Sequence, residues 1–177
     1  MAKGRRRAAA KDYSRFLILY GGGADSTHFI ESEPSARYLL HFESRNREKT
    51  SLVIANARTL GRHLNIISLF EDGSNDGEID QIHALTDTLM ALRGCIRAAS
   101  HGMDGIVLGF NRDDLGIDTD AVLSIMRRSE PEFKILMPLR KRSASSIRLK
   151  MSKSSLPYIS CMTGRQCGQC PKCLRGY

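Results

Sequence analysis

The sequence lacks long apolar runs, and this absence excludes several classes of protein. No part of its 177 residues approaches the roughly 18 apolar residues that a membrane span requires. Residues 1–15 have no apolar run of the kind that marks a secretory signal. Glycine, proline and cysteine are used at ordinary levels, which excludes collagen, coiled coils, disordered acidic tails and disulfide-dense secreted scaffolds. We therefore expect a soluble, cytoplasmic protein without a membrane partner.

Acidic residues are absent from residues 140–177, which carry nine basic residues. Residues 1–15 carry six basic residues and one acidic residue, whereas residues 16–139 carry 12 basic and 18 acidic residues. An acidic body therefore lies between two basic ends. Such ends can contact the phosphates of nucleic acid or of a nucleotide, but basic ends are also common as solvated arms. The sequence leaves both interpretations open.

Five short apolar runs separated by helical segments predict an α/β fold. The runs cover residues 16–20, 38–42, 66–70, 105–110 and 134–137. Helices are expected from near Ser26 to near Pro34, over residues 50–64, 79–102 and 120–126, and from a Ser143 cap through Met151. Continuous apolar runs are typical of strands buried on both faces. We expect a Rossmann-like parallel sheet of five strands with helices on both faces, and a ligand site outside the carboxyl ends of the strands.

Three parts are expected along the chain. Residues 1–15 form a basic flexible arm, residues 16–155 form a nucleotide-binding α/β domain, and residues 156–177 form a cysteine-rich tail that packs on the same domain. The length suits one core-bearing domain rather than two.

Three consecutive glycines follow the first predicted strand. Without side chains, residues 21–23 let backbone N–H groups approach a phosphate closely. The helix expected to start near Ser26 adds the positive end of its dipole, and Ser26 and Thr27 add hydroxyl donors. Asp25 is expected either to contact magnesium beside the phosphates or to cap the helix. The candidate nucleotide-binding residues are Gly21, Gly22, Gly23, Ala24, Asp25, Ser26 and Thr27. The alternative is a flexible turn between strand and helix.

Four of the five cysteines lie close together near the C-terminus. Cys161, Cys167, Cys170 and Cys173 follow the pattern C-x5-C-x2-C-x2-C. Four thiolates at this spacing can complete a tetrahedral structural zinc site, and an iron–sulfur cluster is the main alternative. Disulfides are disfavoured in a reducing cytosol. Cys95 lies near the apolar stripe of the long predicted helix and is expected to be a core residue.

The glycine segment resembles the S-G-G-x-D-S-[ST] loop of the PP-loop ATPases, with Gly21 where that family has serine. The family cleaves ATP between its α and β phosphates and transfers AMP to a substrate oxygen. The resemblance implies an adenine nucleotide alpha hydrolase-like fold, with ATP and Mg2+ as cofactors. It also implies that Asp25 and Ser26 are catalytic residues, with Asp25 holding the magnesium ion.

The loop and the cysteine cluster together make the chain similar to the 7-cyano-7-deazaguanine synthases, and the resemblance extends over most of residues 16–177. Phe42 and Glu43 with Arg47, and Leu108 and Gly109 with Asp114, match shorter stretches of that family. The resemblance implies an ATP-dependent C–N ligase of queuosine-type nucleoside biosynthesis. Its substrates are 7-carboxy-7-deazaguanine and ammonia, and its product is 7-cyano-7-deazaguanine (preQ0), formed through an adenylated intermediate.

The same resemblance implies further roles. The four cysteines would hold one structural Zn2+. Arg47 would be a further phosphate contact or else an ordinary surface arginine, and Asp114 would orient substrate or metal or else cap a helix. A homodimer is the expected assembly.

The chain departs from that family where substrate is expected to bind. Thr86 and Asp87 stand near the place of the family's G-R-N, and residues 116–120 replace its S-G-Y-P-D-C-R segment. Two alternatives follow. One is another PP-loop adenylating enzyme that modifies a tRNA or DNA base, with the basic ends holding the polynucleotide. The other is a nucleotide-binding module that has lost catalysis. Thiolation is disfavoured because no paired cysteine lies outside the cluster to carry sulfur.

Overall fold

The structure is a computed structural model that describes residues 11–43, 47–69, 83–114 and 117–160. These residues form five strands and five helices in alternating order. The elements are β1 (Phe16–Leu19), α1 (Ala24–Ser32), β2 (Tyr38–Phe42), α2 (Arg47–Thr59), β3 (His63–Ile67), α3 (His83–Ser100), β4 (Gly105–Leu108), α4 (Thr119–Met126), β5 (Lys134–Leu136) and α5 (Ala144–Met151).

All the strand pairs in the sheet are parallel, and the strand order is β3-β2-β1-β4-β5. In the register, Ile18 of β1 lies between Leu39 of β2 and Val107 of β4. From β1 the chain builds outward to β3, then returns to place β4 on the other side of β1. The strand order therefore reverses between β1 and β4, which is where open α/β sheets bind their ligands. The Rossmann-like fold expected from the sequence is confirmed.

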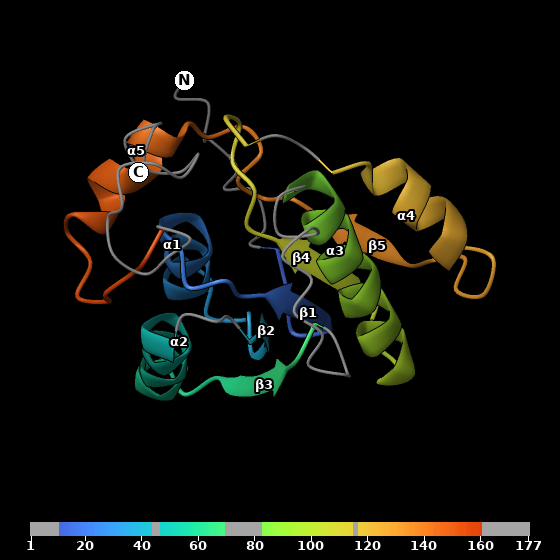
Figure 1. Cartoon of the computed structure of the whole chain (residues 1–177), viewed down its shortest axis with the longest axis horizontal. Helices are drawn as coiled ribbons and strands as arrows, with labels where there is room; N and C mark the ends of the chain where they lie inside the picture. The colour runs from blue at the N-terminus through green and yellow to red at the C-terminus, as the bar shows by residue number, and fades with distance from the viewer. Residues whose placement is uncertain (1–10, 44–46, 70–82, 115–116, 161–177) are drawn as a thin grey trace, which may run out of the picture.

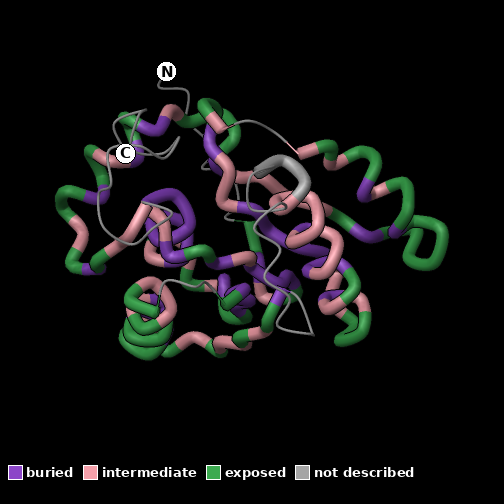
Figure 2. Tube along the Cα trace, in the orientation of Figure 1, coloured by how far each residue is buried: buried purple, intermediate pink, exposed green. Residues whose placement is uncertain are grey.

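Helices cover both faces of the sheet (Figure 1). Helices α1, α2 and α5 enclose one core cluster, to which Phe29, Val53 and Ile147 contribute. Helices α3 and α4 enclose the other, to which Cys95 and Val122 contribute. The buried segments in Figure 2 follow the central strands and the inner sides of these helices. Burying each large apolar side chain contributes about 1.5–3 kcal/mol, so the two clusters hold the sheet and its helices together.

The region around Gly61 differs from the sequence-based expectation. A helix was expected over residues 50–64 and a strand over residues 66–70, whereas α2 ends at Thr59 and β3 runs from His63 to Ile67. Gly61 adopts a left-handed conformation with φ of +61°, and the Arg62 N–H donates to the Ala57 carbonyl at 2.8 Å. This turn ends the helix and starts the strand early, because a glycine accepts positive φ without steric cost.

The other elements follow the sequence closely. The long helix expected over residues 79–102 is α3, and residues 79–82 lie outside the described part. Gly102 has φ of +64° just beyond its end, as a helix stop should. The Ser143 side chain accepts from the Ser146 N–H at 3.3 Å, which confirms the predicted cap of α5. The strand expected over residues 105–110 is shorter, since β4 ends at Leu108.

Residues 13–15, which the sequence analysis assigned to the basic arm, contact the α/β domain. Tyr13 is buried and lies edge-on to Phe29, with ring centroids 5.1 Å apart. The Arg15 guanidinium lies 2.7 Å from an Asp104 carboxylate oxygen. Residues 1–10 lie outside the described part.

Two further expectations concern Cys95 and membranes. Cys95 is fully buried, and burial raises the pKa of its thiol to about 12, so it is an unreactive core residue as expected. In the part of the chain that the structure describes, none of the helices combines the length and apolar character needed to cross a bilayer.

Candidate nucleotide-binding site

Three segments far apart in the sequence meet at the carboxyl ends of β1 and β4. They are the glycine loop with the start of α1 (residues 20–27), the loop after β4 (residues 109–114) and residues 157–160. A Cβ atom at Gly109 would lie 3.1 Å from the Cα and Cβ atoms of Ser26, so the second loop touches the first turn of α1. The Ile159 N–H donates to the Gly22 carbonyl at 2.9 Å, so the third segment lies on the glycine loop. These contacts place all three segments at the reversal in strand order.

The glycine loop requires glycine at its centre. Gly22 has φ of +73°, and a Cβ atom there would lie 2.8 Å from Cγ2 of Val53. Both the backbone conformation and the neighbouring side chain of α2 therefore exclude a larger residue. This packing lets the chain turn directly from β1 into α1.

Helix α1 begins two residues earlier than expected, at Ala24, and its N-cap residue, Gly23, has no side chain that could cap it. Asp25 therefore does not cap the helix, which was one of its two expected roles. The N–H groups of the first turn of a helix have no acceptor within it, and the dipole is positive there. This end of α1 can bind an anion.

The three polar side chains at the start of α1 have different surroundings. Asp25 is 8% exposed in the first turn, where the helix dipole stabilises a carboxylate. The Ser26 hydroxyl donates to the Gly23 carbonyl at 3.3 Å. Thr27 is fully buried, and its hydroxyl lies 3.2 Å from that of Tyr20. The Thr27 hydroxyl, expected at the phosphate, instead supports the loop from inside.

Asn56 of α2 fixes two of the three segments. Its side-chain nitrogen donates to the Tyr20 hydroxyl at 2.8 Å and to the Pro157 carbonyl at 2.8 Å. Asn56 is 1% exposed, so losing either acceptor would leave a buried donor unsatisfied. The sequence analysis did not single out this residue. Its signal was an amide among the apolar positions of a predicted helix, between Val53 and Ala57.

His41 holds the end of β1. Its Nδ1 lies 2.9 Å from the Tyr20 carbonyl oxygen, and its Nε2 lies 3.1 Å from the Thr50 hydroxyl. A carbonyl can only accept, so Nδ1 carries the proton and Nε2 accepts from Thr50. Burial lowers the pKa of His41, which favours this neutral form.

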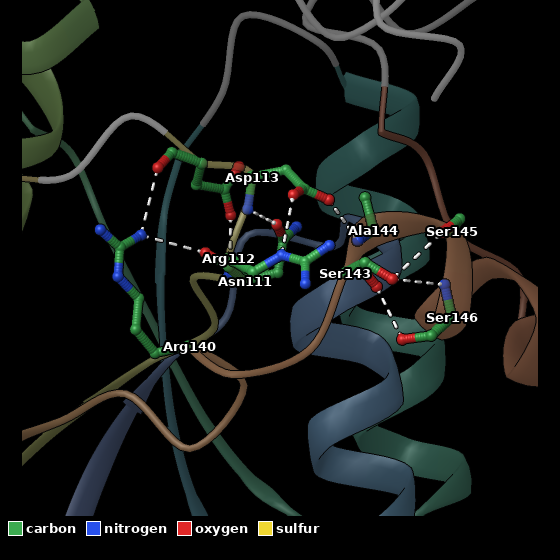
Figure 3. A network of polar contacts seen from close by, with 9 residues as sticks. Asn111, Arg112, Asp113, Arg140, Ser143, Ala144, Ser145 and Ser146 are labelled. Carbon is green, nitrogen blue, oxygen red and sulfur yellow. Dashed lines mark hydrogen bonds and ion pairs between the residues drawn. The ribbon is translucent and has the colours of Figure 1, made fainter.

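The loop after β4 is a tight polar turn, shown in Figure 3. The Asn111 N–H donates to the Asp114 carboxylate at 2.9 Å, and the Asn111 side-chain oxygen accepts from the Asp113 N–H at 2.7 Å. One nitrogen of the Arg140 guanidinium donates to the carbonyls of Asn111 and Asp114, both at 3.1 Å. In this structure Asp114 holds the turn in place, rather than capping a helix.

Asn111 itself is fully buried. Within the described residues its side-chain nitrogen has no hydrogen-bond acceptor. A buried amide N–H2 group without an acceptor is costly, so a ligand oxygen bound here would satisfy it. The sequence analysis did not select this residue.

The same loop contacts the start of α5, and the residues just before α5 contact α1. The Asp113 carboxylate accepts from the Ala144 N–H at 2.8 Å, and this bond holds the pKa of Asp113 below its ordinary value. The Arg142 guanidinium lies 3.1 Å from Nε2 of His28. Burial first, and then the nearby cations of Lys150 and Arg142, lower the pKa of His28 and favour its neutral form. The basic start of α5 is thereby fixed beside the site.

The remaining predicted groups are Arg47 and the four clustered cysteines. Arg47 is exposed at the first residue of α2. Cys161, Cys167, Cys170 and Cys173 lie outside the described residues, and Cys161 directly follows Ser160 in the sequence. Among the residues that are described, no three His, Cys, Asp or Glu side chains are grouped to hold a metal ion.

The donors at the loop fit a magnesium ion that arrives with a nucleotide. Mg2+ at phosphate sites takes one or two protein carboxylates together with phosphate oxygens, rather than a complete protein cage. Asp25 supplies one carboxylate beside the helix end that would receive the phosphates.

Comparison with solved structures identifies similar folds. The chain is similar to the U34-tRNA thiolase NcsA from Methanococcus maripaludis, solved with its 4Fe–4S cluster, at a TM-score of 0.66 and 16% identity. The match covers 92% of this chain and 62% of the thiolase, so the chain spans less than two thirds of that protein. It is also similar to a predicted subunit of tRNA methyltransferase from Methanocaldococcus jannaschii, at a TM-score of 0.56 and 16% identity, covering 77% and 75% of the two chains.

No protein-family model matches the sequence, and comparison with the curated proteins gives no match. The structural likeness establishes a Rossmann-like α/β fold similar to that of these two proteins. It does not single out the 7-cyano-7-deazaguanine synthases.

Proposed function

We propose that this protein is an ATP-dependent enzyme that adenylates an oxygen of a nucleobase, with a base of tRNA as its substrate. The observation that carries the proposal is the glycine loop. Gly22 and Gly23 lead into the start of α1, whose N-cap residue Gly23 has no side chain, at the reversal in strand order, and Asp25 lies in the first turn. A triphosphate and its magnesium ion fit such a loop.

In the proposed reaction, the base oxygen attacks the α-phosphorus of ATP. A bond forms between that oxygen and phosphorus, the bond to the bridging oxygen of the β-phosphate breaks, and pyrophosphate leaves with the electron pair. A nucleophile then adds to the activated carbon, and AMP leaves with the former base oxygen. The first turn of α1 would stabilise the charge that develops on pyrophosphate, and Asp25 would hold the magnesium ion that neutralises it.

A basic surface beside the site supports a polynucleotide substrate. Residues 140–153 contain six basic residues and no acidic residue. Arg140 binds the loop after β4. Four of the other basic residues are exposed: Lys141, Arg142, Lys150 and Lys153. The Asp113–Ala144 and Arg142–His28 contacts hold this surface next to the nucleotide loop. Both similar structures carry tRNA-modifying activities in their names, which supports the same substrate class here.

Reversing three charges on this surface should weaken tRNA binding. The triple variant Lys141→Glu, Lys150→Glu and Lys153→Glu removes phosphate contacts and adds negative charges that repel the phosphates. We therefore expect Kd for tRNA to rise about tenfold or more at moderate salt. The dependence of log Kd on log salt concentration should also become less steep. Fluorescence anisotropy with labelled tRNA measures both quantities.

The control reverses two charges elsewhere on the surface, at Arg127 and Arg128, which are exposed just after α4. This pair should leave the affinity nearly unchanged. Equal weakening by the two sets of substitutions would mean that the α5 surface has no specific role.

The spacing of the four cysteines favours a second candidate, the conversion of 7-carboxy-7-deazaguanine and ammonia to 7-cyano-7-deazaguanine. The chemistry at the glycine loop would be the same, with the substrate carboxylate and then the amide oxygen as acceptors. The cysteines would hold a structural Zn2+ in that case. The similar thiolase is named with a 4Fe–4S cluster, which makes such a cluster the alternative occupant of the four thiolates.

Product analysis separates the two candidates. The protein is incubated with ATP and Mg2+, first with unmodified tRNA and then with 7-carboxy-7-deazaguanine and ammonium, and the acceptor is analysed by mass spectrometry. We expect AMP release that depends on tRNA and an adenylated or substituted base. Formation of the nitrile would instead assign the protein to deazaguanine synthesis. Metal analysis of anaerobically purified protein identifies zinc or iron in the tail.

A further inference from the structure

Residues 157–160 form a short strap across the glycine loop. The strap is fixed at its start, where Asn56 donates to the Pro157 carbonyl at 2.8 Å. In its middle, the Ile159 N–H donates to the Gly22 carbonyl at 2.9 Å. At its end, the Ser160 hydroxyl accepts from the Ala24 N–H at 3.2 Å. A segment far along the chain therefore supplies a hydroxyl to the first turn of α1.

The Ala24 N–H is one of the donors that a helix start leaves without an acceptor in the helix. A hydroxyl group has one proton to donate and two lone pairs that accept. While Ser160 accepts from Ala24, no hydrogen bond among the described residues uses its own proton, which can therefore be donated to a ligand. A phosphate oxygen at this end of α1 would be within reach of both the hydroxyl and the neighbouring backbone donors.

The hydroxyl groups within the loop are engaged elsewhere. Ser26 donates to the Gly23 carbonyl, and the Thr27 hydroxyl pairs with that of Tyr20 beneath the loop. Gly21 has no side chain, although a Cβ atom there would have no neighbour within 4 Å. Ser160 is thus placed to provide a hydroxyl that the loop's own side chains, in these contacts, do not.

We infer that Ser160 is a nucleotide-binding residue, whose hydroxyl donates to a phosphate oxygen of the nucleotide held by the glycine loop. The inference rests on the proposed function and extends its site to a residue outside the loop motif. It also explains why the strap is so firmly held. Leu156 is buried just before it, and Asn56 fixes its first carbonyl, so the hydroxyl is positioned before any ligand binds.

The test measures the affinity of Ser160→Ala for pyrophosphate and for ATP, each with Mg2+, by calorimetry. Loss of one hydrogen bond to a charged group should raise Kd about tenfold. The control is Ser155→Ala, which removes an exposed hydroxyl five residues away and should leave Kd unchanged. Thermal unfolding of each variant shows whether the fold is intact.

A hydroxyl introduced at the open position 21 provides a second, independent readout. Gly21 does not have positive φ, and the space around it accepts a side chain. We expect Gly21→Ser to restore much of the affinity lost in Ser160→Ala, because either residue can present a hydroxyl to the phosphates. A purely structural role of Ser160 would not be rescued from position 21.

The outcomes distinguish the inference from the proposed function. Nucleotide binding by the wild type with unchanged affinity in Ser160→Ala would overturn the role of Ser160 and leave the proposed function standing. Weaker binding that Gly21→Ser does not improve would also overturn it, because Ser160 would then act through the shape of the strap alone. Absence of binding by the wild-type protein would overturn both.

Discussion

Asp25→Asn is expected to lower ATP turnover by at least about a hundredfold. Asp25 is the acidic residue of the first turn of α1 and is 8% exposed beside the glycine loop. Asparagine keeps the size of the side chain but loses the negative charge that would hold magnesium against the phosphates. The rate of AMP formation from ATP, at saturating Mg2+, measures the effect.

A control on the same helix separates charge from stability. Glu31→Gln makes the same acid-to-amide change two turns along α1, at a side chain that accepts from the Ser154 hydroxyl at 2.7 Å. This variant should retain turnover. If Asp25→Asn turned over ATP at the wild-type rate, the carboxylate would have no part in the chemistry, and the proposed magnesium site would be wrong.

Of the substitutions proposed for this protein, Gly105→Ala should lower its stability most. A Cβ atom at Gly105 would lie 2.0 Å from the Lys134 carbonyl oxygen and 2.8 Å from its carbon. Both neighbours are backbone atoms of β5, which pairs with β4 at this position, so the two strands would have to separate. We expect the free energy of unfolding to fall by about 3 kcal/mol or more, as for severe overpacking.

Urea denaturation of Gly105→Ala and of Gly21→Ala provides the comparison. A Cβ atom at Gly21 has no neighbour within 4 Å, so the control should change stability by no more than about 0.5 kcal/mol. Similar stability of the two variants would show that β4 and β5 are not paired in this register. Because β4 leads into the loop of residues 109–114, the strand separation expected in Gly105→Ala would also displace that side of the site.

The local features of the fold were predictable because they depend on residues close in sequence. The apolar run ending in three glycines predicted β1 and its turn into α1, and Ser143 predicted the start of α5. The boundary between α2 and β3 was misplaced because Leu64 continues a helical spacing past Gly61. Only the left-handed conformation of Gly61 shows that the helix has already ended.

The supporting residues of the site were not predictable, because their partners are distant in sequence. Asn56 is recognisable as a polar residue on an apolar helix face. Its bonds to Tyr20 and Pro157 form only when the fold brings both residues to α2. In the sequence, Ser160 is recognisable only as the residue before the first clustered cysteine. Its bond to Ala24 spans 136 residues, so no local pattern connects it with the glycine loop.

The most direct measurement is to identify which bond of ATP the protein breaks. Purified protein is incubated with ATP, Mg2+ and a tRNA pool that lacks base modifications, and AMP, ADP, pyrophosphate and phosphate are quantified together. Cleavage between the α and β phosphates should give AMP and pyrophosphate in equal amounts, and Asp25→Asn should abolish both. Formation of ADP and phosphate, or no consumption of ATP with any acceptor, would contradict the assignment of this loop to adenylation.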